Sequence, residues 1–182
     1  MERIIIFVVL SVPLVILSWR TLFSMKSHGL YRFLAWECMA WLLSTNYRFW
    51  FNEPGSLNQV FSWICLLLSI YLVVAGVILL KRSGKPENKR TEKELYQFER
   101  TTQLVETGIY KYIRHPLYSS LLFLSWGIFL KNISAETGII ALLSSAFLYF
   151  TALADEKECI VYFGEKYREY MKSTKRFLPF IL

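Results

Sequence analysis

The stretch of sequence best equipped for chemistry is Arg114-His115-Pro116-Leu117-Tyr118. It lies where a charged segment meets an apolar one, and Pro116 suits the first turn of a helix, where a backbone N–H would be unpaired anyway. Such a helix start favours anions. A cation, a titratable ring and a hydroxyl are therefore expected at one depth. They form either a binding site or an interfacial anchor, in which Arg snorkels and Tyr joins the aromatic belt.

A carboxylate pair, Asp155-Glu156, stands at the end of the last apolar segment. Two adjacent carboxylates can bind ribose hydroxyls or an ammonium group, or can pair with Arg114. Near a helix C-terminus they oppose the dipole, which argues against a purely stabilising role, although an ordinary surface charge pair is the simpler alternative. Glu37 is a further carboxylate, inside the second apolar segment. Either it faces an internal cavity, or the helix starts later and Glu37 is interfacial.

The rest of the composition argues against several kinds of binding site. The eight glycines are too dispersed to build a phosphate-binding or dinucleotide-binding loop. Two histidines exclude a three-histidine metal site, and three cysteines without regular spacing give no zinc pattern, so we expect no metal. The formal net charge of +7 fits loops beside anionic headgroups. We expect no nucleic-acid partner, because so apolar a chain has little surface for a phosphate-binding stripe.

The elements that must position these residues are predicted to form an all-α integral membrane helical bundle. Long apolar segments separated by charged stretches predict about five transmembrane helices, since helical pairing satisfies the backbone within lipid. The fourth segment is short, and we expect it to extend back through Pro116 or to form a tight hairpin with the fifth. We expect one membrane domain over residues 1–182, with three spans in 1–80 and the catalytic part in 81–182. The apolar segments cover residues 4–19, 30–51, 57–80, 117–130 and 133–154.

Lysine and arginine are concentrated in the first loop, in the polar insert 81–115 and in the tail after residue 154. The positive-inside rule therefore predicts an N-terminus outside and a C-terminus in the cytoplasm. Within the insert, Thr91-Glu92-Lys93-Glu94 resembles a capping box that opens a short helix. In the tail, residues 155–171 are predicted to form an amphipathic helix at the membrane interface. Its apolar face consists of Ile160, Phe163, Tyr167 and Tyr170.

Two separate stretches together resemble the signature of the isoprenylcysteine carboxyl methyltransferases and the related phospholipid methyltransferases. The first, residues 104–118, contains the Arg-His-Pro-x-Tyr pattern. The second begins at the carboxylate pair, continues as Phe-Gly-x-x-Tyr-x-x-Tyr over residues 163–170, and ends at Arg176-Phe177-Leu178-Pro179. The resemblance covers residues 104–179. The chain departs from the family pattern at two positions, and both departures bear on which substrate it takes. Ser120 stands where the family often has glycine, and Asp155 stands where it usually has glutamate.

The resemblance implies an S-adenosylmethionine-dependent methyltransferase that holds its cofactor between the hairpin and the tail, without a Rossmann fold. Carried over by position, His115, Tyr118 and Glu156 contact the cofactor. Tyr110 and Asp155 are assigned to the same cofactor pocket. The implied partners are the lipid bilayer and a lipophilic, membrane-associated methyl acceptor, such as an isoprenylcysteine-like carboxylate or a lipid.

Arg114 and Glu156 are the implied catalytic residues. Arg114 supports the cofactor pocket or orients a substrate carboxylate by paired hydrogen bonds. A carboxylate acceptor is ionised at neutral pH and requires no base. An amine or thiol acceptor reacts faster with the help of a general base, and Glu156 or His115 is then the candidate base.

A second family also has a stretch similar to Arg-His-Pro-x-Tyr, namely the NADPH-dependent membrane sterol reductases. The Asp-Glu-x-x-Cys tail of some of them matches residues 155–159. They usually have asparagine where Leu117 stands, and they are longer. We therefore favour methyl transfer and keep the reductase as the alternative, since a shared fold does not determine function. A non-catalytic membrane scaffold is a third class.

Overall fold

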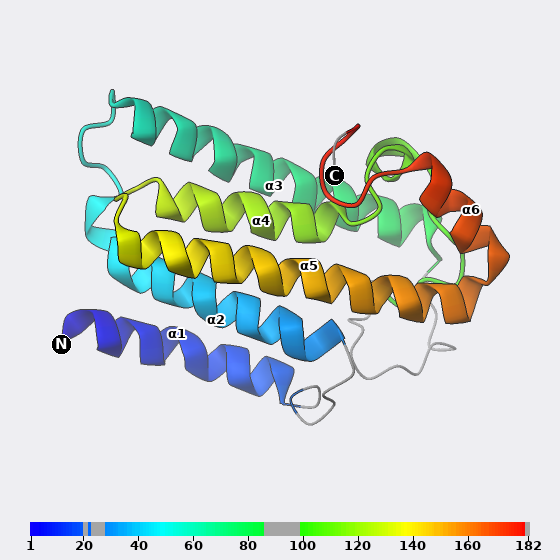
Figure 1. The fold of residues 1–182 in the computed structure, drawn as a ribbon, viewed down its shortest axis with the longest axis horizontal. Coiled ribbons are helices and arrows are strands. Elements are labelled where there is room, and N and C mark those ends of the chain that lie inside the picture. Colours follow the sequence, from blue (N-terminus) through cyan, green and yellow to red (C-terminus); the bar gives the residue numbers. More distant parts are fainter. Residues whose placement is uncertain (20–21, 23–27, 86–98, 181–182) are drawn as a thin grey trace.

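The computed structural model describes residues 1–19, 22, 28–85 and 99–180, and these form helices and loops without a strand. Five long helices lie side by side in one bundle, with the N-terminus at one end and α6 at the other (Figure 1). The elements are α1 (Glu2–Ser18), α2 (His28–Asn46), η1 (Tyr47–Phe49), α3 (Leu57–Ser83), η2 (Gly108–Lys111), α4 (Pro116–Phe129), α5 (Ala135–Phe163) and α6 (Glu165–Ser173).

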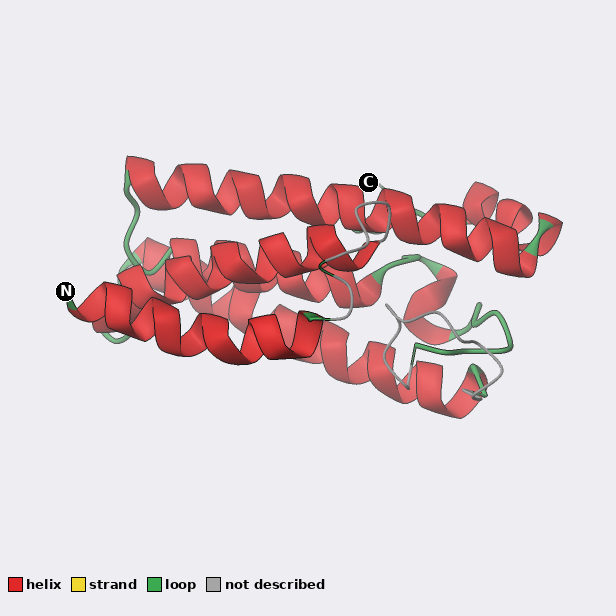
Figure 2. Cartoon of the chain, turned by 90° about the horizontal axis from the view of Figure 1, so that it is seen from below, coloured by secondary structure: helices red, strands yellow, loops and turns green. Residues whose placement is uncertain are grey.

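The main packing pairs are α2 with α5 and α3 with α4, while α4 also contacts α5 and α1 packs on α2 (Figure 2). Helix α5 begins at a capping box: the Thr137 backbone N–H donates to the Ser134 hydroxyl, and the Ser134 backbone N–H donates to the Thr137 hydroxyl. Helix α4 has Pro116 at its first position, as predicted. Buried side chains of α2, α3, α4 and α5 meet between these helices at Leu42, Leu66, Ile128 and Ala141.

Close approach of α3 and α4 depends on small residues. A Cβ atom added at Gly127 would lie 2.9 Å from the Leu66 side chain, and one added at Gly76 would lie 3.0 Å from Leu117. The Ser62 hydroxyl donates to the Gly127 carbonyl oxygen at 2.6 Å. Small residues let two backbones approach closely in an apolar environment. They therefore hold α4, which follows directly on Arg114-His115, against α3.

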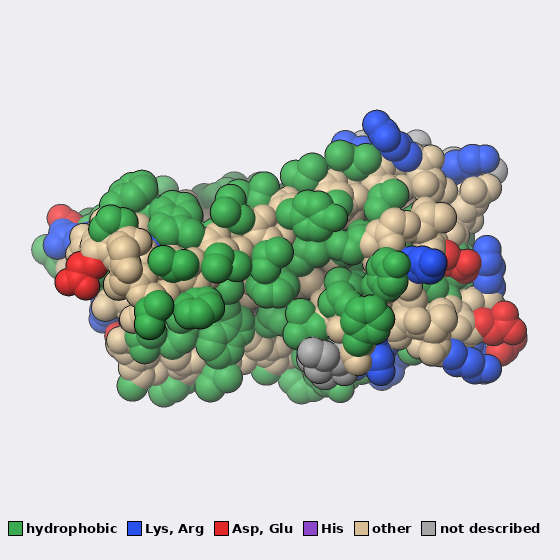
Figure 3. All heavy atoms as spheres, turned by 90° about the horizontal axis from the view of Figure 1, so that it is seen from above, with side chains coloured by type: hydrophobic (Ala, Val, Ile, Leu, Met, Phe, Trp, Pro, Cys, Tyr) green, Lys and Arg blue, Asp and Glu red, His purple; other side chains and the backbone are tan. Residues whose placement is uncertain are grey.

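Two helices of the described residues, α3 and α5, are long and apolar enough to cross a membrane. Only 22% of the most apolar window of α3 is buried inside the protein, and many of the apolar side chains of α3 are exposed. Figure 3 shows apolar side chains along the bundle and charged side chains gathered at its two ends. The other apolar segments also form helices, but α1 has 17 residues, α4 has 14, and α2 carries His28, Arg32 and Glu37.

The sequence predicts one amphipathic helix over residues 155–171, and the structure differs. Helix α5 continues to Phe163 and ends at Gly164, which has φ 64° and ψ −139°. That region is accessible to glycine at little cost and to other residues only with strain. The separate helix α6 is amphipathic, and it buries Tyr167 and Tyr170 against the rest of the protein. The carboxylate pair thus belongs to the long helix and not to the tail helix.

Two smaller expectations have clear outcomes. Helix α2 begins at His28, so a helix that starts after Glu37 is wrong. Instead Glu37 lies mid-helix, and its Oε2 accepts a hydrogen bond of 2.6 Å from the Ser11 hydroxyl of α1. Its Oε1 is buried, and no hydrogen-bond partner for it is found among the described residues. The capping box predicted at Thr91-Glu92-Lys93-Glu94 lies outside the described residues.

Candidate active site

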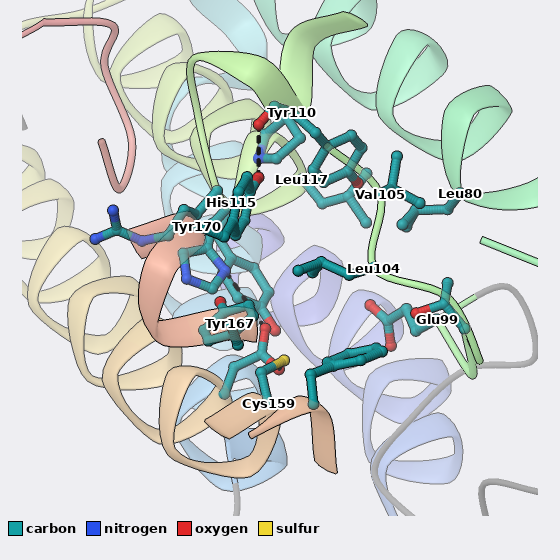
Figure 4. A pocket seen from close by; sticks show the side chains of 16 residues that line it. Leu80, Glu99, Leu104, Val105, Tyr110, His115, Leu117, Cys159, Tyr167 and Tyr170 are labelled. Atoms are coloured by element: carbon teal, nitrogen blue, oxygen red, sulfur yellow. Dashed lines mark hydrogen bonds and ion pairs between the residues drawn. The ribbon is translucent and has the colours of Figure 1, made fainter. Parts of the chain in front are cut away.

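A pocket lies at the α6 end of the bundle and holds about 680 Å³ of space, the open solvent at its mouth included. In Figure 4 the apolar residues Leu80 and Val105 stand on one side of the pocket, and His115, Tyr167 and Tyr170 on the other. The pocket therefore joins an apolar wall to a polar one.

The polar wall is built where two distant parts of the chain meet. The backbone N–H of Arg114 donates to the Lys175 carbonyl at 2.8 Å, and that of His115 donates to the Arg176 carbonyl at 3.2 Å. In return the Lys175 N–H donates to the Tyr112 carbonyl at 3.0 Å. Because these hydrogen bonds join main-chain groups, they position the turn before α4 independently of the side chains in that turn.

His115 occupies the centre of the polar wall. Its ring is almost fully buried, with Nδ1 at 3.4 Å from Asp155 Oδ2 and Nε2 at 3.4 Å from Glu156 Oε1. It stacks on the Tyr118 ring, with 5.3 Å between centroids and an interplanar angle of 20°. Burial lowers the pKa of His115, but pairing with Asp155 and Glu156 outweighs it, so the pKa lies above its usual value. The two carboxylates therefore favour the protonated form of the ring over the neutral form.

Glu156 is buried and is held by two guanidinium groups. Arg176 donates from Nε to Oε1 at 3.0 Å and from Nη2 to Oε2 at 2.8 Å, and Arg114 donates from Nε to Oε1 at 3.0 Å. Arg114 also donates from Nη1 to the Met171 carbonyl at 3.1 Å and to the Thr174 carbonyl. A buried carboxylate needs such partners, because an unpaired charge there is strongly destabilising.

Tyrosine side chains of η2 and α6 close the pocket. The Tyr170 hydroxyl donates to the Tyr110 carbonyl at 2.6 Å, which ties α6 to the turn that precedes α4. Burial raises the pKa of Tyr110, Tyr167 and Tyr170 above the usual tyrosine value. Their hydroxyls therefore stay protonated near neutral pH and can donate hydrogen bonds.

Most residues predicted for the site meet at this pocket. Its lining includes Tyr110, Arg114, His115, Tyr118 and Asp155. Glu156 is not among the lining residues, since its carboxylate is taken up by Arg114 and Arg176. The roles assigned to all six residues stay predictions.

Sequence reasoning missed two charged contributions to the site. Glu99 lines the pocket, and Arg32 of α2 pairs with it at 3.2 Å. Arg32 is nearly buried at the start of an apolar segment, and that position was the available signal. Arg176 was noted only as part of the signature, and no spacing pattern shows that it reaches Glu156.

One group of side chains bears on the expectation of no metal. His28 Nδ1 lies 2.8 Å from Glu158 Oε2, and ligand-type atoms of His28, Asp155 and Glu158 all lie within 4.8 Å of one another. An ion pair between the ring and the carboxylates accounts for this arrangement, and a bound cation would also fit it. The absence of a metal therefore stays a prediction.

Comparison with known proteins decides the family. The model of the phospholipid methyltransferase family matches residues 57–166, which run from the start of α3 to the start of α6 and include both Arg114-His115 and Asp155-Glu156. The chain belongs to this family. The expected membership in the isoprenylcysteine and phospholipid methyltransferase group is thereby confirmed.

A curated relative gives a narrower likeness. The chain is similar to the methanethiol S-methyltransferase of Pseudomonas deceptionensis, at 32% identity over 71 residues. The matched part is 39% of this chain and 26% of the relative, so the chain covers about a quarter of that protein's length. No solved structure matches the chain.

Proposed function

We propose that the protein is an S-adenosylmethionine-dependent methyltransferase that acts on a membrane-associated acceptor. The observation that carries this proposal is the family match over the residues that build the pocket. The same match favours methyl transfer over the NADPH-dependent reductase, whose likeness rests on short motifs.

The pocket fits a cationic methyl donor. Its wall carries the carboxylates of Asp155 and Glu99 and the aromatic side chains of Phe163 and Tyr167, and both kinds of group attract cations. When bound, S-adenosylmethionine supplies a methyl group on a positively charged sulfur. Asp155, which faces the pocket, is the carboxylate that contacts the donor in this proposal.

Arg114 at the wall and Glu156 behind it then hold the site together. The contacts of Arg114 with Glu156 and with two carbonyls of the tail support the first of its two expected roles, holding the pocket together. Glu156 accepts hydrogen bonds from both guanidinium groups and lies 3.4 Å from Nε2 of the His115 ring. His115, Tyr118 and Tyr110 form the part of the wall that orients the donor and excludes water, so that positioning and desolvation provide most of the rate.

The acceptor in this proposal is an isoprenylcysteine-like carboxylate or a lipid, which reaches the pocket along its apolar side. Leu80, Leu104 and Leu117 form that side. A small thiol is the second candidate, and the observation that favours it is the name of the relative, methanethiol S-methyltransferase. A thiol must lose its proton to react, and the candidate base is Glu156 or the neutral form of His115.

The membrane arrangement is part of the proposal. Helices α1–α5 correspond to the five apolar segments and are proposed to cross the bilayer, with α1 beginning outside and the pocket on the cytoplasmic side. Residues 1–182 form one membrane domain. Every lining residue of the pocket falls between Leu80 and Tyr170, which supports a catalytic part in residues 81–182 behind three N-terminal spans.

The test is calorimetric binding of S-adenosylmethionine and of NADPH to the detergent-purified protein. We expect S-adenosylmethionine to bind, to lose affinity in His115→Ala, and to keep it in Arg168→Ala, whose side chain is exposed and pairs with Glu165. Binding of NADPH alone would reject the methyltransferase. Transfer of a labelled methyl group to a farnesylated cysteine, to phospholipid vesicles or to methanethiol then identifies the acceptor class.

A further inference from the structure

Arg176 holds Glu156, the more buried of the two carboxylates that contact the His115 ring within the described part of the chain, yet Arg176 does not line the pocket itself. We propose that Arg176 is a positioning residue, which fixes Glu156 so that the His115 ring keeps its place in the pocket wall. The part of this inference that concerns methyl transfer rests on the function proposed above. The coupling between Arg176 and His115 does not.

The contacts of Glu156 are unequal. Arg176 engages both carboxylate oxygens, through Nε at 3.0 Å and Nη2 at 2.8 Å. Arg114 and His115 contact Oε1 alone, at 3.0 Å and 3.4 Å. A two-point contact between guanidinium and carboxylate sets the plane of the carboxylate, whereas contacts to a single oxygen allow it to rotate. The orientation of Glu156 therefore depends mainly on Arg176.

Arg176 is itself fixed to the site from several directions. Its carbonyl accepts the His115 N–H at 3.2 Å, and its guanidinium lies 5.1 Å from the centre of the Tyr149 ring. The next residue, Phe177, is 3% exposed and packs with Tyr118. One residue thus contacts the His115 main chain directly and the His115 ring through Glu156.

The charge around His115 makes this coupling measurable. The ring faces Asp155 and Glu156 of α5, with Tyr118 of α4 and Phe177 of the tail as its uncharged neighbours. Removing the Arg176 charge leaves Glu156 Oε2 without its guanidinium. The negative potential at the ring then increases and favours the imidazolium, so the pKa of His115 rises further.

The experiment compares Arg176→Met and Arg176→Lys with the same change at an exposed site, Arg168→Met. Arg168 is 58% exposed in its side chain and pairs with Glu165. The chain has two histidines, so selective isotope labelling of histidine gives two ring signals, and the His115→Gln spectrum assigns them. The pH titration of the His115 signal is then followed by NMR in each variant, without any methyl donor or acceptor.

We expect the His115 signal to titrate at higher pH in Arg176→Met, at an intermediate pH in Arg176→Lys, and as in the wild type in Arg168→Met. Lysine restores the charge but contacts one oxygen at a time. An unchanged His115 titration in a folded Arg176→Met protein would overturn the inference. If that variant does not fold, Arg176→Lys decides, because its titration must then still differ from the wild type.

Kinetics separate positioning from simple stabilisation. We expect the KM for S-adenosylmethionine to rise about ten-fold in Arg176→Met, with a smaller change in kcat, as when a partner that orients a binding residue is removed. A lower melting temperature with KM unchanged would mean that Arg176 is only structural. A shifted His115 titration in a protein that binds no S-adenosylmethionine would reject the proposed function and leave the positioning role standing.

Discussion

Replacement of Glu156 by glutamine tests the view that this carboxylate holds the site together. The side chain keeps its size, and it loses the charge that Arg114 and Arg176 share at 2.8–3.0 Å. With its oxygen in the Oε1 position, glutamine can still accept two of these hydrogen bonds, both weaker without the charge. Its NH2 group then faces the Arg176 Nη2–H group, so two donors meet. They do so out of contact with water, because residue 156 is 4% exposed.

The expected magnitude follows from these contacts. Each hydrogen bond to a charged group contributes about 1.5–3 kcal/mol, and three such bonds are affected. The losses are not additive, and removal of one partner from a buried ion pair typically costs about 3–5 kcal/mol. We expect that loss in the free energy of unfolding for Glu156→Gln. Asp155→Asn should lose only about 1 kcal/mol, because its contact with His115 is longer, at 3.4 Å, and asparagine can preserve it.

The assay pairs SDS-induced unfolding with calorimetric binding of S-adenosylmethionine. We expect Glu156→Gln to stay folded in mild detergent, with reduced stability and reduced donor affinity. In Asp155→Asn the affinity should fall while the stability barely changes. The control is Glu165→Gln, whose side chain is 79% exposed and should change stability by no more than about 0.5 kcal/mol. If Glu156→Gln unfolds at the same SDS concentration as the control, the reasoning about the two guanidinium groups is refuted.

Three further perturbations have definite expected results. Tyr170→Phe leaves the Tyr110 carbonyl without its donor and should lower the free energy of unfolding by about 1–3 kcal/mol, measured by SDS titration. Gly164→Ala forces a side chain into a backbone region with φ 64° and should cost about 1–3 kcal/mol, whereas an equal melting temperature would contradict the strain. Protonated His115 stabilises the fold, and its pKa is raised. Its contribution is therefore complete below about pH 6.5 and is lost as pH rises through the raised value, so the difference in stability between wild type and His115→Gln should shrink above neutrality.

Much of the helical architecture is predictable from the sequence, because a backbone in an apolar environment has few alternatives to a helix. The apolar segments locate α1–α5, and Pro116 marks the start of α4. The end of α5 was misplaced because the apolar run stops at Ala154, whereas the helix continues with polar residues to Phe163. Gly164 was the signal in the sequence for that end, and hydropathy does not detect it.

The site was predictable as a meeting of two motifs and not in its internal arrangement. Asp155 and Glu156 are neighbours in sequence, but successive residues on a helix point about 100° apart, so they reach different nitrogens of the His115 ring and otherwise have different partners. Asp155 turns to the pocket, and Glu156 turns to the guanidinium groups. The ion pair between Arg176 and Glu156 depends on how the tail returns over α5, which local sequence patterns do not encode.

The short parallel bridge between Ile113 and Lys175 has a consequence for the order of folding. The two residues are separated by α4, α5 and α6, so the contact closes a long loop and carries a large entropic cost until the hairpin between them has formed. The helices can therefore pack against one another before the segment with Lys175 and Arg176 pairs with the turn that precedes α4. Until that pairing forms, Glu156 lacks Arg176 and Arg114 lacks the Thr174 carbonyl, so the polar wall of the pocket should be completed only late in folding.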